Sequence, residues 1–173
     1  HISKEMAVMF SDIHAFTTIS EGMTSQENFS FVNAYLKRVS PVIRENDGII
    51  VKFLGDGMMA VFQNGAQDAV LAGIAKLKAV IAYNQHRVSD GWDQIKVGVG
   101  IHIGPMMVGM VGESNRMQGD AFSDNVNLTA RLEGLTRFYG VTLVISQEVV
   151  SALPETAGFA LRYLDRVVVK GRT

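Results

Sequence analysis

The segment IIVKFLGDGMMAVF, residues 49–62, has two apolar, β-prone runs on either side of a Gly-Asp-Gly tripeptide. A short glycine-containing connection between two such runs is typical of a β-hairpin. We therefore predict strands over Ile49–Leu54 and Met58–Phe62, with Asp56 at the tip of the turn.

A strand and a helix are predicted before this hairpin, and a helix and a strand after it. Residues 7–10 are a short apolar run, which favours a buried strand. Thr24 and Glu27 have the spacing of a capping box, which marks the start of a helix. Apolar residues at helical spacing predict a helix over 66–86, and alternating residues predict a strand over 95–103. The resulting order, β-α-β-β-α-β, is that of a split βαβ, or ferredoxin-like, unit.

The remaining residues predict an added C-terminal β-α-β-α-β region. We expect a strand over 106–111 to pair with 95–103 through a turn at Gly104-Pro105. The later elements are a helix, a strand, a short helix and a last strand or strand pair, at 124–138, 141–145, 147–153 and 159–169. The fold class is therefore α+β, with a central, mostly antiparallel sheet flanked by helices.

Composition narrows the possible functions. The 173 residues include 16 Lys and Arg against 17 Asp and Glu, so a basic nucleic-acid-binding face is disfavoured. There is no cysteine for a disulfide, a thiolate metal site or a nucleophile. The most apolar stretch, 69–82, is interrupted by Lys76 and Lys78 and is too short to span a bilayer.

The organisation indicates one domain over residues 1–173 that is cut from a longer protein. The chain begins without a methionine and ends directly after the strand-like run VVVKGRT. We expect a covalently linked regulatory or sensor domain in the full-length protein. The expected location is the cytoplasm, because a chain without cysteine fits a reducing compartment. The full-length protein can still be membrane-tethered.

Two aspartates are candidate metal ligands. Asp12 directly follows the first predicted strand, and Asp56 occupies the hairpin tip. In a split βαβ sheet the third strand inserts beside the first, so the two carboxylates are expected to meet at one sheet edge. Two adjacent carboxylates repel unless a cation joins them, and oxygen ligands suit Mg²⁺ or Mn²⁺. The alternative is a purely local role, because Asp is common in turns.

Other polar residues are candidates for substrate contacts, but each also has a purely structural interpretation. The backbone N–H groups of the loop from Ile13 to Thr17 are suited to phosphate. Asn127 and Arg131 are four residues apart and share a helix face, which is either a phosphate and sugar site or a solvated surface. Lys52 can simply extend along apolar neighbours, and Lys170 can protect an edge strand from aggregation.

Five motifs, in order, resemble class III nucleotidyl cyclases, which are the catalytic domains of adenylate and guanylate cyclases. They are FSDIHAFTTISE, VKFLGDGMMAVF, GIHIGPMMVGMVG, SDNVNLTARLE and VVVKGR. The resemblance spans about Glu5 to Arg172. It implies a ferredoxin-like catalytic core that works as a head-to-tail homodimer with two sites at the interface. It also implies two Mg²⁺ or Mn²⁺ ions per site and conversion of a nucleoside triphosphate to a 3′,5′-cyclic monophosphate and pyrophosphate.

The resemblance assigns a role to each candidate residue. Asp12 and Asp56, with Ile13, would bind the metals, and Lys52 and Asp120 would recognise the base. The groups that would act on the ribose and the phosphates are Asn127, Arg131 and Lys170. The loop that would hold the β and γ phosphates comprises Ile13, His14, Ala15, Phe16 and Thr17.

Substrate choice is expected from hydrogen-bond polarity. Lys52 can donate to adenine N1 and Asp120 can accept from the N6 amino group, whereas guanine reverses these polarities. Guanylate cyclases typically carry Glu at the Lys52 position, so ATP is the expected substrate. His14-Ala15 and Ser123 depart from the common family pattern. The alternatives are a guanylate cyclase, a non-catalytic nucleotide-sensing homologue, and an RNA-binding ferredoxin-like module.

Overall fold

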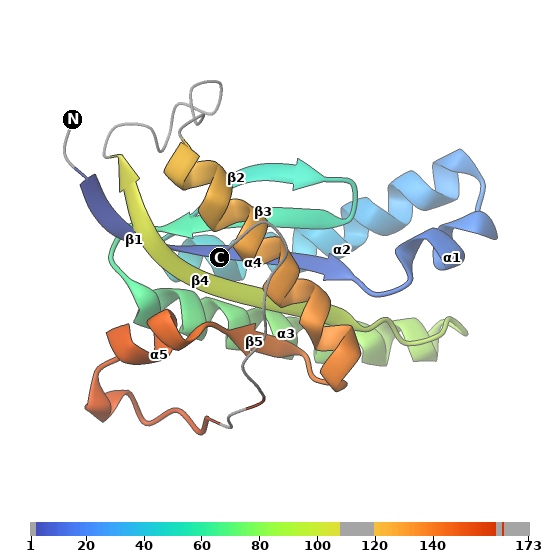
Figure 1. Cartoon of the computed structure of the whole chain (residues 1–173). Coiled ribbons are helices and arrows are strands. Elements are labelled where there is room, and N and C mark those ends of the chain that lie inside the picture. The colour runs from blue at the N-terminus through green and yellow to red at the C-terminus, as the bar shows by residue number, and fades with distance from the viewer. Residues whose placement is uncertain (1–2, 108–119, 162–163, 165–173) are drawn as a thin grey trace.

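The computed structural model describes residues 3–107, 120–161 and 164, and its centre is a five-stranded sheet (Figure 1). The strand order is β2-β3-β1-β4-β5. Neighbouring strands are antiparallel except β4 and β5, which are parallel. The strands are β1 (Ser3–Ile13), β2 (Gly48–Leu54), β3 (Gly57–Phe62), β4 (Val97–Met107) and β5 (Leu143–Ile145).

Helices connect these strands in the predicted order. They are α1 (Phe16–Glu21), α2 (Ser25–Glu45), α3 (Ala66–Ser89), α4 (Asp120–Tyr139) and α5 (Gln147–Ala152), followed by a 3₁₀ turn at Glu155–Ala157. The hairpin β2-β3 lies on one side of β1, and β4 lies on the other. The split βαβ unit and the α+β class are therefore confirmed. Within the described ranges, no helix is long and apolar enough to cross a membrane.

The sheet is covered on both faces, because its side chains alternate between two apolar clusters. Ala7 and Met9 of β1 belong to the larger cluster, which α2 and α3 cover. Met6 and Val8 belong to the smaller cluster, against which Val126 of α4 packs. In Figure 1, α4 crosses the front of the sheet while α2 and α3 lie behind it.

The start of α2 follows directly from its sequence. The Thr24 hydroxyl accepts from the Glu27 N–H at 3.1 Å, and the Glu27 carboxylate accepts from the Thr24 N–H at 2.9 Å. Both bonds of the predicted capping box are thus present.

The prediction of a turn at Gly104-Pro105 is wrong. One strand continues through both residues and pairs with β1 from Ser3↔Met107 to Ile13↔Val97. Gly104 serves close packing instead, because a Cβ there would collide with the Asn125 side chain of α4. Residues 106 and 107 of the strand predicted over 106–111 are therefore the end of β4, and its other residues lie outside the described part. Most of the predicted last strand, 159–169, also lies outside it.

The hairpin contains an irregularity that determines where Lys52 lies. The β2-β3 register shifts between Ile50 and Lys52, so Lys52 is opposite Met59. Without this bulge Lys52 would be opposite Met58, which belongs to the larger buried cluster. Met59 belongs to the smaller cluster on the α4 side of the sheet. The bulge therefore places Lys52 on the α4 side of the sheet, where its side chain is exposed.

Candidate active site

The two predicted aspartates meet at one end of the sheet. Asp12 lies at the end of β1, and Asp56 lies in the turn between β2 and β3. The Ile13 N–H donates to Asp56 Oδ2 at 2.8 Å, so the hairpin tip is held against the end of β1. The convergence expected from the topology is therefore confirmed.

The Asp56 carboxylate occupies an unfavourable position for its charge. Burial raises its pKa above the ordinary value, the Ile13 N–H opposes this shift, and the Asp12 charge adds to it. A bound cation would compensate both carboxylates. With the Ile13 carbonyl as a further candidate, the donors are all oxygen, and they fit Mg²⁺ or Mn²⁺.

The loop after β1 offers fewer free amides than the sequence analysis expected. The Ile13 N–H is used by Asp56, and the His14 N–H donates to the Lys96 carbonyl at 2.8 Å. Phe16 and Thr17 lie in the first turn of α1, where the helix itself supplies no acceptor. The phosphate-binding role of Ile13 and His14 through their backbone amides is therefore disfavoured.

Ala15, between the strand and α1, has a strained backbone. Its φ is 55° and its ψ is 34°, in the left-handed region. This conformation costs an L-amino acid roughly 1–2 kcal/mol, whereas glycine adopts it freely. The departure from the family pattern at this position is thus visible as local strain.

A polar network from α4, which the sequence analysis missed, surrounds Asp12. Arg137 Nη2 donates to Asp12 Oδ1 at 2.8 Å, and Arg137 Nη1 lies 3.6 Å from Glu133 Oε1. His14 Nε2 lies 2.9 Å from Thr136 Oγ1. Burial, together with the nearby Asp12 carboxylate, raises the pKa of Glu133 to about 8. The spacing of Glu133, Thr136 and Arg137, at i, i+3 and i+4, is the signal that indicated one shared helix face.

A buried lysine lies beneath the same end of the sheet. The Lys76 side chain of α3 is fully buried and donates to the Ser11 hydroxyl next to Asp12. Its ammonium nitrogen is 5.6 Å from the centre of the Tyr35 ring. Burial lowers the pKa of Lys76 to about 7, while the charges of Asp12 and Asp56 oppose that shift.

The other predicted site residues do not join this cluster. Asn127 and Arg131 are exposed on α4, and Lys52 is exposed on β2. Arg131 and Glu133 are two residues apart, about 200° around the helix, so they occupy opposite sides of α4. Asp120 is the first residue of α4, but its side chain lies outside the described part, as does all of Lys170.

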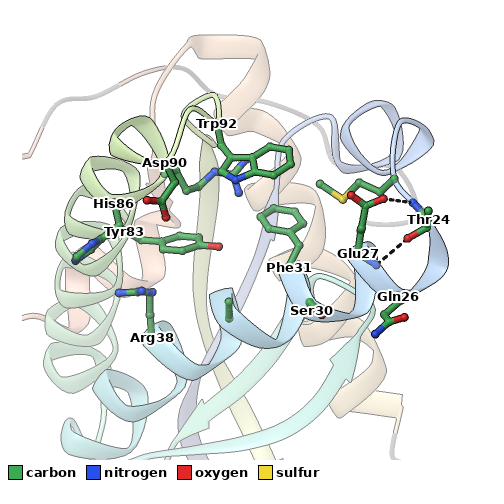
Figure 2. A pocket seen from close by; sticks show the side chains of 13 residues that line it. Thr24, Gln26, Glu27, Ser30, Phe31, Arg38, Tyr83, His86, Asp90 and Trp92 are labelled. Carbon is green, nitrogen blue, oxygen red and sulfur yellow. Dashed lines mark hydrogen bonds between the residues drawn. The ribbon is translucent and has the colours of Figure 1, made fainter.

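A cavity of about 540 Å³ lies elsewhere, between α2 and α3 (Figure 2). Phe31, Tyr83 and Trp92 form its aromatic wall, and the Arg87 guanidinium lies 4.7 Å from the centre of the Phe31 ring. None of the predicted site residues whose side chains the structure describes lines this cavity. The candidate active site is therefore the carboxylate end of β1, not the cavity.

The family described as the adenylate and guanylate cyclase catalytic domain matches residues 2–173. This chain belongs to that family. The cyclase resemblance predicted from the five motifs is therefore confirmed.

Individual cyclases show the same relationship. An adenylate cyclase of Anabaena cylindrica is 38% identical over 98% of this chain and 35% of its own length. The crystal structure of the guanylyl cyclase Cya2 has a TM-score of 0.76, with 27% identity, over 98% of this chain and 87% of that chain. A bacterial light-regulated adenylyl cyclase has a TM-score of 0.72, with 29% identity, over 90% of this chain and 46% of that chain.

The chain spans 8–35% of the length of the first three curated relatives that it matches. Its relatives also include both adenylate and guanylate cyclases. Membership of the family therefore establishes a cyclase catalytic domain, while the choice of base depends on the residues of this chain.

Proposed function

We propose that this domain is an adenylate cyclase that converts ATP to 3′,5′-cyclic AMP and pyrophosphate at a composite site in a homodimer. The most similar curated relatives include adenylate cyclases at 33–38% identity. The chain also carries chemically suitable residues at the seven side-chain positions that the family resemblance assigns, which are Asp12, Lys52, Asp56, Asp120, Asn127, Arg131 and Lys170.

The observation that carries the dimer is the division of α4 into two faces. Glu133 and Arg137 contact the chain's own Asp12 region, whereas Asn127 and Arg131 are exposed on another side of the helix. With about 100° between successive residues, Arg131 cannot turn toward its own aspartates without unwinding α4. A substrate held by Asp12 and Asp56 would therefore receive Arg131 from a second copy.

Exposed apolar residues support such an assembly. Phe53 and Leu54, next to Lys52 in the hairpin, have exposed fractions of 46% and 44%, and Phe138 of α4 has 80%. Contact between copies would bury this apolar surface. A two-fold axis would then create two equivalent sites, each with residues from both chains.

The reacting groups have complementary roles in this account. Asp12 and Asp56 would hold two divalent cations, and the N–H groups of Phe16 and Thr17 would contact the terminal phosphates. Bound Mg²⁺ would lower the pKa of the ribose 3′-hydroxyl and neutralise the triphosphate. Asn127 would orient the ribose. Arg131 and Lys170 would stabilise the negative charge that grows on the α-phosphate and the leaving pyrophosphate.

Base recognition depends on Lys52 and Asp120. The bulge before Lys52 leaves its ammonium group exposed, where it can donate to adenine N1. Asp120 would accept from the N6 amino group. Guanine presents an acceptor and a donor in the reverse arrangement, so the same pair opposes GTP.

Product formation by the purified chain tests this proposal. With Mn²⁺ present, we expect cyclic AMP from ATP and much less cyclic GMP from GTP. Lys52→Glu should lower kcat/KM for ATP about tenfold to a hundredfold, which corresponds to roughly 1–3 kcal/mol for an unmatched polar pair. GTP use should rise only partly, because Asp120 would still oppose guanine O6.

Lys37→Glu is the matched control, since Lys37 is an exposed lysine on α2. It makes the same charge change away from the site and should leave ATP turnover within about twofold. Unchanged ATP kinetics in Lys52→Glu would contradict the adenine assignment. Preferred turnover of GTP by the unaltered chain would indicate a guanylate cyclase, and no product from either nucleotide would indicate a non-catalytic homologue.

The full-length protein is a separate proposal. The greater length of the curated relatives supports further regions outside this chain, one of which we propose to be a linked regulatory or sensor domain. A cytoplasmic position of the catalytic domain is part of the same proposal.

A further inference from the structure

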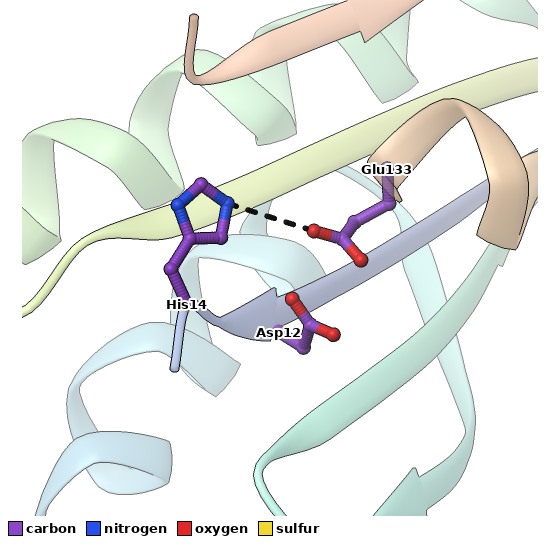
Figure 3. A group of neighbouring side chains, drawn as sticks. All are labelled: Asp12, His14 and Glu133. Atoms are coloured by element: carbon purple, nitrogen blue, oxygen red, sulfur yellow. Dashed lines mark ion pairs between the residues drawn. The ribbon is translucent and has the colours of Figure 1, made fainter. Parts of the chain in front are cut away.

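Three metal-binding side chains come together beside the proposed magnesium site. One donor atom each from Asp12, His14 and Glu133 lies within 4.8 Å of the other two. Figure 3 shows the His14 ring and the Glu133 carboxylate facing each other above Asp12. His14 Nε2 and Glu133 Oε2 are 3.7 Å apart. Donors that share a zinc ion at about 2.0–2.2 Å are separated by a similar distance.

Glu133 provides an independent indication of a ligand. Its side chain is 3% exposed, and its Oε2 atom accepts no hydrogen bond of ordinary length in the described part of the chain; its polar neighbours are His14 Nε2, at 3.7 Å, and the Asp12 carboxylate. Buried carboxylate oxygens usually have partners, and an exception calls for a cause. The Oε2 atom faces His14 and the space shared with Asp12 (Figure 3).

The donor set differs from that of the neighbouring magnesium site. Asp12 and Asp56 offer oxygen alone, whereas Asp12, His14 and Glu133 include an imidazole. Imidazole with carboxylates suits Zn²⁺ and other first-row transition cations, and Mg²⁺ prefers oxygen and water. We propose that Asp12, His14 and Glu133 form a binding site for a transition cation of the zinc class.

Existing contacts define what must move. Arg137 pairs with Asp12 and lies near Glu133, and Thr136 contacts His14 Nε2. The Arg137 side chain is 43% exposed, so it can turn into solvent when a cation replaces it. Glu133 and His14 must bind in their deprotonated forms, so metal uptake releases protons wherever these groups were protonated.

The shared ligand gives this site a regulatory consequence, which rests on the proposed cyclase function. Asp12 is a ligand of both sites, so a zinc-class cation that binds it beside His14 and Glu133 competes with the catalytic magnesium for its carboxylate. The transition cation therefore inhibits the cyclase, and Mg²⁺ relieves the inhibition by competing for Asp12. The binding itself does not depend on cyclase activity.

Calorimetric titration of the metal-free chain with Zn²⁺ tests the binding, and Co²⁺ absorption in the visible range reports imidazole coordination. Glu133→Gln and His14→Asn should each weaken Zn²⁺ binding at least about tenfold, the scale on which metal sites respond to lost partners. Asp56→Asn is the matched control, because it removes a carboxylate that is not a ligand of this site and keeps an acceptor for the Ile13 N–H. The Asp56 charge acts on Glu133, so Zn²⁺ binding should change by only about a few fold, clearly less than in Glu133→Gln or His14→Asn.

The outcomes separate the two neighbouring sites. Undiminished Zn²⁺ binding in both Glu133→Gln and His14→Asn, or its loss in Asp56→Asn, would place the cation at the magnesium pair and overturn the proposal. No Zn²⁺ binding by the unaltered chain would also overturn it. If Glu133→Gln fails to fold, His14→Asn decides.

Activity provides the second measurement. With ATP and Mg²⁺, Zn²⁺ should inhibit the unaltered chain, and Glu133→Gln should need at least about tenfold more Zn²⁺ relative to its own uninhibited rate. Equal sensitivity of the two proteins would contradict the regulatory role. If the chain proves inactive, the cyclase proposal fails, while the Zn²⁺ titration still decides whether the cation site exists.

Discussion

The two sides of α4 face different surroundings. Toward the sheet, Glu133 and Arg137 contact the Asp12 region and hold the helix against the carboxylate end of β1, which is the proposed metal end. On another side, Asn127 and Arg131 are exposed to solvent. One helix thus carries residues that complete the chain's own carboxylate cluster and residues that suit a site elsewhere. Under the proposed function, this difference would explain why Arg131 serves the site of a second copy and not the site of its own chain.

A substitution at Asp56 tests the proposed metal-binding role of the carboxylates. We expect Asp56→Asn to lower cyclic AMP formation at least about a hundredfold, because a bound cation contributes several kcal/mol to such reactions. Thermal stability without metal should hold or rise. Burial raises the pKa of Asp56, so its charged form is unfavourable in the fold, and Asn still accepts from the Ile13 N–H. Activity within a few fold of normal would refute the metal assignment.

The two arginines of α4 sharpen the comparison. Arg131→Ala should lower kcat by about 10²–10³, the effect of removing one transition-state donor, with little change in thermal stability because the residue is exposed. Arg137→Ala should change stability by about 0–1 kcal/mol, as for other exposed ion pairs, and should alter the Mg²⁺ concentration needed for activity. A larger fall in kcat for Arg137→Ala than for Arg131→Ala would reverse the roles assigned to the two faces.

The buried lysine beneath the metal end predicts a pH dependence. Burial lowers the pKa of Lys76 to about 7 from its ordinary value of 10.5. Between these pH values the unfolded chain binds the proton more fully than the folded chain, so stability from this group rises as pH increases. Below about pH 7 the buried charge has its full destabilising effect.

Thermal melting from pH 7 to 9 should show a steeper rise, or a smaller fall, with pH in the unaltered chain than in Lys76→Met. The raised pKa of Glu133, about 8, gives the opposite slope below about pH 8, and that contribution is common to both proteins. Lys78→Met removes an exposed lysine on the same helix and should leave the slope unchanged. Equal slopes in the Lys76→Met variant and the unaltered chain would show that Lys76 does not lose its proton in the fold.

The smallest expected effect concerns the loop between the metal end and α1. Ala15→Gly should stabilise the chain by about 0.5–1 kcal/mol, because glycine removes the left-handed strain and gives back part of that gain as chain entropy. Ala34→Gly, in the middle of α2, should instead destabilise it by a similar amount. Urea unfolding measures both, and a loss of stability in Ala15→Gly would show that this backbone is unstrained.

Local signals made most of the fold predictable. The capping box at Thr24 and Glu27 and the Gly-Asp-Gly turn each involve residues close in sequence. The prediction failed at Gly104-Pro105, because glycine and proline are common in turns and the pair therefore predicts one. In the structure β1 supplies a pairing partner along the whole of β4, and Gly104 makes room for Asn125.

The site was predictable where topology alone brings residues together, as for Asp12 and Asp56. It was not predictable where a side chain depends on a distant partner. Lys76 interrupts an apolar run, and its burial is tolerated through Ser11, 65 positions away. The bulge that redirects Lys52 likewise has no local sequence signal. Glu133 and Arg137 are four residues apart, so the sequence indicates that they share a helix face. The prediction considered only the face that carries Asn127 and Arg131.

The central claim is that one site takes its aspartates and its arginine from different chains. Asp12→Ala and Arg131→Ala homodimers each lack one required group in both sites. A heterodimer of the two has one site with both defects and one site with neither. Random equal mixing makes about half of the dimers heterodimers, so roughly a quarter of normal activity should return. Asp12→Ala mixed with Asp56→Asn is the control and should recover none, because both defects fall on the metal half.

Cyclic AMP formed after subunit exchange is therefore the most direct measurement. The account predicts recovery toward about a quarter of normal activity for the Asp12→Ala and Arg131→Ala mixture, from the symmetry of a two-fold dimer, and background activity for the control mixture. Background activity in both mixtures, with heterodimers demonstrated by mass spectrometry, would contradict it and place the complete site within one chain.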